Sequence, residues 1–149
     1  MSKISGILSG VAGEHFVAAE LSRRGYIASL TSKNTKGIDL LASNEVASKT
    51  VGIQVKTNQG SRKAWLLNEK CEDFYSDTLH YVFVNLNGLS APDFYIVPST
   101  IVAEHIKKSH QVWLNTPGRS GEPHKDTSMR MFHDQEDIYL NKWELLGLD

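Results

Sequence analysis

The sequence predicts a single α/β domain, residues 1–149, with a mixed central β-sheet flanked by helices. Two observations carry this prediction. An amphipathic helix opens the chain with short strands close behind it, and a later β-hairpin leads into a second helix. The early strands lie too close together for repeated β-α-β units, and no glycine-rich dinucleotide fingerprint is present, so we do not expect a Rossmann fold.

The first half of the chain predicts one helix and three strands. The helix spans about residues 10–24 and has a strong stop signal, because Arg23 and Arg24 in its last turn precede a capping Gly25. Polar turns then separate the strands. These three strands are expected over residues 26–30, 38–42 and 50–57.

The second half of the chain predicts a hairpin between two helices. A turn rich in Asn, Gly, Pro and Asp joins two β-rich runs, and a later stretch with two prolines and two glycines predicts a loop. The expected elements are a basic loop over residues 58–63, a helix around 67–75, strands over 80–86 and 94–97, a helix capped by Ser99 or Thr100 that runs to about 108, the loop over 115–128 and a short helix over 137–146.

Composition and charge exclude several classes of protein. With 40% hydrophobic and 22% charged residues the chain is typical of a globular protein, and no segment is apolar enough to span a membrane. The N-terminus lacks the features of a signal peptide, and Cys71 has no partner cysteine for a disulfide, so a cytoplasmic location is expected. The net charge of −1 argues against a protein that coats DNA non-specifically.

Two carboxylates occupy positions where apolar residues are expected. Glu14 falls within the apolar stripe of the first helix, beside Val17 and Leu21. Asp39 interrupts an otherwise apolar strand, although aspartate is a poor strand former. Each has an ordinary alternative, since Glu14 could be satisfied by local donors and Asp39 by a turn. A carboxylate on a core-facing stripe otherwise needs a pairing partner or a cation.

The strand over residues 50–57 carries the third unusual feature. Its period-two alternation places Ile53 and Val55 on one face and Gln54 and Lys56 on the other. The ordinary alternative is an edge strand with one face in water. On a central strand, an amide and an ammonium on the same face require polar partners.

Together, these elements resemble the PD-(D/E)XK nuclease superfamily, in particular the small Holliday-junction-resolvase-like and restriction-type endonucleases. The resemblance rests on G-E-H-F-V-A-A-E-L, G-I-D-L-L and I-Q-V-K-T in that order, over residues 13–57. It implies a restriction-endonuclease-like fold with an αβββαβ core, and magnesium-dependent hydrolysis of DNA phosphodiesters.

The resemblance also implies a role for each motif residue. Asp39 is the central metal ligand, Glu14 binds the metal directly or through water, and Gln54 is the third ligand. Lys56 orients the attacking water or stabilises negative charge on the phosphate. Magnesium is the expected cofactor, with manganese as a substitute, because both accept oxygen ligands. Gln54 departs from the usual Glu or Asp and brings no negative charge.

Basic residues around the motif are candidates for contacts to DNA phosphates, although a solvated surface would equally explain them. This set comprises Arg23, Arg24, Lys33, Lys36, Arg62 and Lys63, with Thr57 as a polar addition and His124, Lys125 and Arg130 further along the chain. The expected partner is DNA, the resemblance implies a homodimer, and a protein partner from a DNA-processing system is a further expectation. The alternative function is a weak or inactive nuclease relative that binds nucleic acid or a protein.

Overall fold

A computed structural model describes residues 2–32 and 35–149 of the chain. Ser5 caps the first helix, because its side chain accepts a hydrogen bond from the Leu8 N–H at 3.2 Å. The elements in chain order are α1 (Gly6–Arg23), β1 (Ile27–Leu30), β2 (Leu40–Ser43), β3 (Thr50–Asn58), β4 (Ala64–Asn68), the 3₁₀ helix η1 (Glu69–Glu72), β5 (Leu79–Asn85), β6 (Asp93–Pro98), α2 (Ser99–Leu114), β7 (Met129–His133) and the 3₁₀ helix η2 (Trp143–Leu146).

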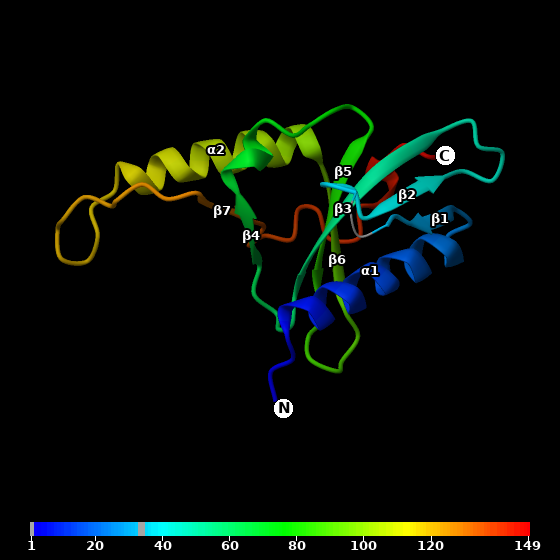
Figure 1. Ribbon diagram of the computed structural model, residues 1–149, viewed down its shortest axis with the longest axis horizontal. Coiled ribbons are helices and arrows are strands. Elements are labelled where there is room, and N and C mark those ends of the chain that lie inside the picture. Colours follow the sequence, from blue (N-terminus) through cyan, green and yellow to red (C-terminus); the bar gives the residue numbers. More distant parts are fainter. Residues whose placement is uncertain (1, 33–34) are drawn as a thin grey trace.

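The main sheet has five strands in the order β1-β2-β3-β5-β6, and β3 is its central strand (Figure 1). Neighbouring strands are antiparallel except for β3 and β5, which run parallel with Gln54 opposite Tyr81 and Lys56 opposite Phe83. The predicted mixed sheet and hairpin are therefore confirmed. Strands β4 and β7 form a separate two-stranded antiparallel sheet.

The two faces of the main sheet are covered differently. Helix α1 and η2 cover one face, where Val17 and Leu21 of α1 pack against Ile53 and Val55 of β3. On the other face, Tyr81 and the alternate residues of β5 and β6 pack against α2 and the β4–β7 sheet. The period-two alternation predicted for β3 is confirmed, since its apolar residues enter the α1 core and Gln54 and Lys56 belong to the opposite face.

The prediction of a helix around residues 67–75 is wrong. Residues Ala64–Asn68 instead form β4, in which Trp65 and Leu67 are buried and the intervening Leu66 is exposed. Only the short η1 follows, so the connection between the parallel strands β3 and β5 contains no α-helix. The partner of β4 is β7, more than sixty residues later, which explains why local periodicity did not reveal either strand.

The remaining boundaries differ at the element ends. Helix α1 begins four residues earlier than expected, and α2 continues to Leu114 without a side-chain cap at its N-terminus. The outer edge of β6 is covered by the C-terminal segment, through hydrogen bonds from the Ile96 N–H to Tyr139 and from the Asn141 N–H to Phe94. In the described ranges, no helix has the length and apolar character needed to cross a membrane.

Candidate active site

Asp39 lies where the β2–β3 ladder ends, one residue before β2. The ladder's last pair is Leu40 opposite Ile53, and the Asp39 N–H donates to the Ile53 carbonyl at 2.8 Å. The Asp39 carboxylate then accepts the Val55 N–H through Oδ2 at 2.7 Å. The side chain thus replaces the next backbone acceptor of β2, and this hydrogen bond holds the carboxylate between the two strands.

Glu14 approaches the same region from α1. Its side chain is half-buried, one residue after Gly13, which lies directly against β3. Burial raises the pKa of the Glu14 carboxyl, and the negative charge of Asp39 raises that pKa further, while His15 opposes the shift. The prediction that Glu14 needs a compensating partner has a physical basis here, because two carboxylates from different elements repel each other.

Gln54 and Lys56 share the opposite face of β3, and both are half-buried. In the amide orientation that satisfies its neighbours, Gln54 donates to the Gly37 carbonyl at 3.0 Å and accepts from Lys56 Nζ at 3.2 Å. Gln54 therefore connects Lys56 to the turn that precedes Asp39. Sequence reasoning missed the Gly37 carbonyl, whose signal is its place immediately before I-D-L-L.

These residues fit a hard divalent cation such as magnesium. Across residues 2–32 and 35–149, no three His, Cys, Asp or Glu side chains come together as a metal site. The donor set here is smaller, with two carboxylates that repel each other and the amide oxygen of Gln54. Magnesium commonly takes only one or two protein carboxylates and keeps several waters. A cation between Glu14 and Asp39 would relieve their repulsion.

A solved structure with a similar fold is that of a bacterial homing endonuclease, I-Ssp6803I. It aligns with a TM-score of 0.57 at 13% identity, over 97% of this chain and 94% of that chain. The chain therefore has a restriction-endonuclease-like fold, as the sequence predicted. Hjc, a Holliday junction resolvase from Archaeoglobus fulgidus, aligns with a TM-score of 0.49 at 12% identity, over 87% of this chain and 86% of that chain. No family model and no curated protein matches the chain.

Several candidate DNA-contacting residues have internal partners within this restriction-endonuclease-like fold. Arg23 and Arg24 contact the Glu20 carboxylate at 3.1 and 3.5 Å, and the Arg24 guanidinium also lies 4.9 Å from the ring centroid of Trp143. Lys63 contacts Asp137 at 2.9 Å. Each of the three basic residues therefore has a partner within the chain, although the Arg23 side chain is still 72% exposed.

The other predicted contacts separate into buried and exposed residues. The Thr57 hydroxyl is buried against Gly13 of α1, so this hydroxyl is inaccessible to a phosphate in the present arrangement. Lys36 and Arg62 are exposed, whereas Lys33 lies outside the described residues. Arg130 is buried. Arg62 and Lys36 thus keep the accessibility that a phosphate contact requires.

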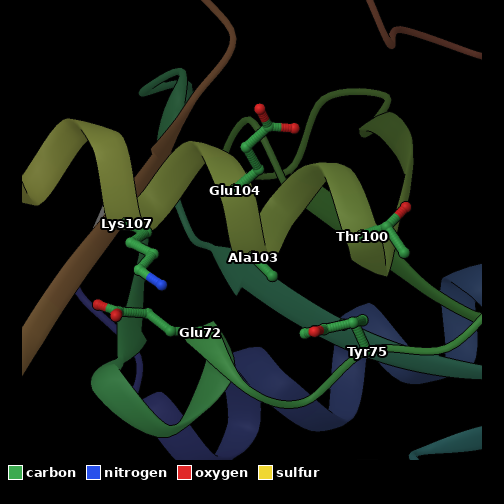
Figure 2. A pocket seen from close by; sticks show the side chains of 6 residues that line it. All are labelled: Glu72, Tyr75, Thr100, Ala103, Glu104 and Lys107. Atoms are coloured by element: carbon green, nitrogen blue, oxygen red, sulfur yellow. The ribbon is translucent and has the colours of Figure 1, made fainter.

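A pocket of about 290 Å³ between η1 and α2 does not contain the candidate residues (Figure 2). Its wall includes Glu72, Glu104, Lys107 and Tyr75. The Glu72 carboxylate is already bound by Arg130, and Glu104 pairs with Lys108 on the surface of α2. The acidic side chains of this pocket therefore differ from Glu14 and Asp39, which have no cationic partner in the described part of the chain.

Proposed function

We propose that this chain is a magnesium-dependent DNA endonuclease, with Glu14, Asp39, Gln54 and Lys56 as its active site. The observation that carries the proposal is the position of the Asp39 carboxylate, which the Val55 N–H holds between β2 and β3. Burial raises the pKa of Glu14, and the negative charge of Asp39 raises that pKa further. A paired carboxylate site on the fold of the PD-(D/E)XK nucleases supports phosphodiester hydrolysis over other reactions.

Each side chain then has a defined role. Asp39 and Glu14 hold the cation, and the hydrogen bond from the Val55 N–H keeps the Asp39 carboxylate oriented. Gln54 supplies a neutral oxygen and positions Lys56 through the 3.2 Å contact. The Lys56 ammonium orients the water nucleophile or stabilises charge on the phosphate oxygens. When bound, magnesium or manganese would acidify a water and screen the phosphate charge.

The test is a cleavage assay on linear, supercoiled, single-stranded and four-way-junction DNA in magnesium and in manganese. Asp39→Ala and Lys56→Ala are each expected to reduce cleavage by about 100-fold or more, the usual size of losing a charge-stabilising catalytic group. Lys108→Ala is the matched control, because Lys108 is an exposed lysine that pairs with Glu104 on α2. Equal cleavage by all four proteins would identify a contaminating nuclease and refute the proposal.

A second candidate function is a nuclease relative that binds nucleic acid or a protein without cleavage. The contact between Lys56 and the Gln54 oxygen favours this candidate, since that oxygen already accepts a hydrogen bond and carries no charge. Binding of DNA in both metals, with no cleavage of any of the four substrates, would establish it. Cleavage that disappears in Lys56→Ala would exclude it.

Four expectations from the sequence stay predictions: a single domain, a homodimer, a protein partner in a DNA-processing system, and a cytoplasmic location. A homodimer would place two active sites on the two strands of a duplex. Light scattering of the purified protein, alone and with DNA, distinguishes a dimer from a monomer by mass.

A further inference from the structure

The connection between β5 and β6 carries a leucine side chain that is exposed to solvent. Leu89 is 93% exposed, whereas Leu86 at the start of the same connection is buried. Single exposed apolar residues are common on protein surfaces, so exposure alone assigns no role. The conformation, position and charge surroundings of this turn are what point to a function.

The turn that carries Leu89 has a fixed conformation. Asn87 and Gly88 both have positive φ angles, of 54° and 66°, which is uncommon for the non-glycine Asn87. The Asn87 side-chain amide donates to the Ala91 carbonyl and to Asp93 Oδ2, both at 3.0 Å, and the Ser90 N–H donates to the Asn87 carbonyl at 3.1 Å. Leu89 is therefore held outward by a rigid frame.

The same turn is anchored to the strand that carries Gln54 and Lys56. Beyond β3, the Gln59 carbonyl accepts the Gly88 N–H at 2.9 Å, and the Gly60 carbonyl accepts the Asn87 N–H at 3.2 Å. Figure 1 shows this connection at the same end of the molecule as the start of α1. From Lys56 to Asn58, the last residue of β3, two residues of extended chain span about 7 Å, which equals roughly two base-pair steps of 3.4 Å along a duplex.

The surroundings of this end of the sheet suit a nucleic acid backbone. Gln59 also binds the N-terminal arm, because its side chain accepts the Ile4 N–H at 3.0 Å and donates to the Ser2 carbonyl at 3.3 Å. Lys3 in that arm and Arg62 after Gln59 are both exposed, and the first turn of α1 contains no acidic residue. The two cations are thus on segments that Gln59 and Gly60 connect by hydrogen bonds to the turn that carries Leu89.

We propose that Leu89 is a wedge that inserts into the base stack of duplex DNA bound at the proposed active site. This inference rests on the proposed DNA substrate but not on cleavage. Apolar side chains, leucine among them, insert between base steps, unstack them and kink the duplex. Lys3 and Arg62 bind the phosphates on either side, and the rigid turn holds the leucine in position to enter the stack. The substrate class this favours is DNA with an easily unstacked step near the cleaved bond.

The test uses short duplexes with 2-aminopurine at successive positions, because the fluorescence of this base rises when it is unstacked. The protein carries Lys56→Ala, so that the proposed cleavage does not consume the DNA. Fluorescence anisotropy reports binding in the same samples. We expect a rise in 2-aminopurine fluorescence on binding, and we expect Leu89→Ala in the same background to abolish that rise. Because Leu89 is exposed, Leu89→Ala should not unfold the protein, and circular dichroism of the variant checks this.

Val46 provides the matched control. It is 80% exposed in the β2–β3 hairpin, where Ala47 also has a positive φ, but it lies at the opposite end of β3. Val46→Ala should keep the full fluorescence rise. The wedge proposal is refuted if the 2-aminopurine fluorescence still rises with Leu89→Ala, or if DNA binds without any rise in this fluorescence. It is also refuted if the protein does not bind DNA. A rise that depends on Leu89, in a protein whose wild type never cuts, would refute only the nuclease proposal.

Discussion

Gly13 of α1 lies directly over Thr57 of β3. A Cβ atom added to Gly13 would meet Thr57 Oγ1 at 1.9 Å, Thr57 Cβ at 3.0 Å and Thr57 Cγ2 at 3.1 Å. The Thr57 hydroxyl is buried without a hydrogen-bond partner in the described structure. Only glycine permits this approach of helix to strand, and the next residue along α1 is Glu14. The Gly13–Thr57 contact therefore sets how closely Glu14 approaches Asp39.

The first prediction is that Gly13→Ala destabilises the fold. The new methyl group overlaps Thr57, so α1 must move away from β3 at a cost of about 1–3 kcal/mol, as in other overpacked cores. The displaced helix also withdraws Glu14, so magnesium affinity should fall. Denaturant unfolding measures the first effect, and the magnesium-dependent rise in melting temperature measures the second.

Gly10 and Thr57 supply the controls for this prediction. A Cβ added to Gly10 meets nothing within 4 Å, so Gly10→Ala should stabilise the helix by up to about 1 kcal/mol through propensity alone. Thr57→Ala removes the atom at 1.9 Å and should restore part of the stability of Gly13→Ala. Equal losses from both glycine substitutions would show that the Gly13–Thr57 contact does not set the helix position.

The second prediction concerns Glu14 and pH. Its pKa is raised in the folded protein, so the folded state holds this proton more tightly than the unfolded chain. The stability from this group is complete below the unfolded pKa and is lost as pH rises through the folded pKa. Without metal, Glu14→Gln should therefore raise the melting temperature at pH 7 relative to wild type, and the difference should shrink toward pH 4.

Magnesium should reverse this order. A ligand that binds only the folded state stabilises it more when it binds more tightly, and Glu14→Gln lacks one of the two carboxylates. Saturating magnesium is thus expected to raise the melting temperature of wild type more than that of the variant. An identical magnesium response in both proteins would remove Glu14 from the proposed metal site.

The sequence predicted the elements whose causes are local. Glu14 on the apolar stripe of α1, and the alternation of Gln54 and Lys56 with Ile53 and Val55, follow from the periods of helix and strand. These patterns placed the candidate residues on the correct elements. They did not predict the Asp39–Val55 hydrogen bond, which depends on where the β2–β3 ladder stops.

Long-range pairing explains why the sequence did not predict another part of the fold. The strands β4 and β7 are each five residues long and pair across the whole β5–β6–α2 segment. Arg130 was a candidate DNA contact because it follows a polar loop, yet it is 8% exposed. Its guanidinium is held by Glu72 of η1 and by the Thr127 and Met129 carbonyls, none of which a local pattern identifies.

The third prediction is that this buried arginine holds β7 in place. Arg130→Met keeps the length of the side chain but leaves the largely buried Glu72 carboxylate without its partner. Loss of one member of a buried ion pair typically costs about 3–5 kcal/mol. Chemical denaturation should show a loss of this order, and adding Glu72→Gln should recover much of it.

An exposed ion pair gives the comparison. Lys108 and Glu104 on α2 are 2.8 Å apart, with side chains 75% and 65% exposed. Lys108→Met should leave the free energy of unfolding nearly unchanged, because solvent screens such pairs. If Arg130→Met were no more destabilising than Lys108→Met, the Arg130–Glu72 contact would not stabilise β7.

The fourth prediction is that Gln54→Glu tightens magnesium binding by about tenfold or more, equivalent to about 1.4 kcal/mol. The new carboxylate adds a negative charge beside Asp39 and forms an ion pair with Lys56, whose Nζ already lies 3.2 Å from the Gln54 oxygen. The substitution also removes the N–H group that donates to the Gly37 carbonyl, which limits the gain in affinity.

Titration calorimetry with magnesium measures the affinity directly, and Gln111→Glu on the exposed surface of α2 controls for a general change in net charge. A gain confined to Gln54→Glu, accompanied by faster DNA cleavage, would mean that the neutral amide limits the activity of the natural protein. A similar gain in Gln111→Glu, or none in Gln54→Glu, would place the cation away from residue 54.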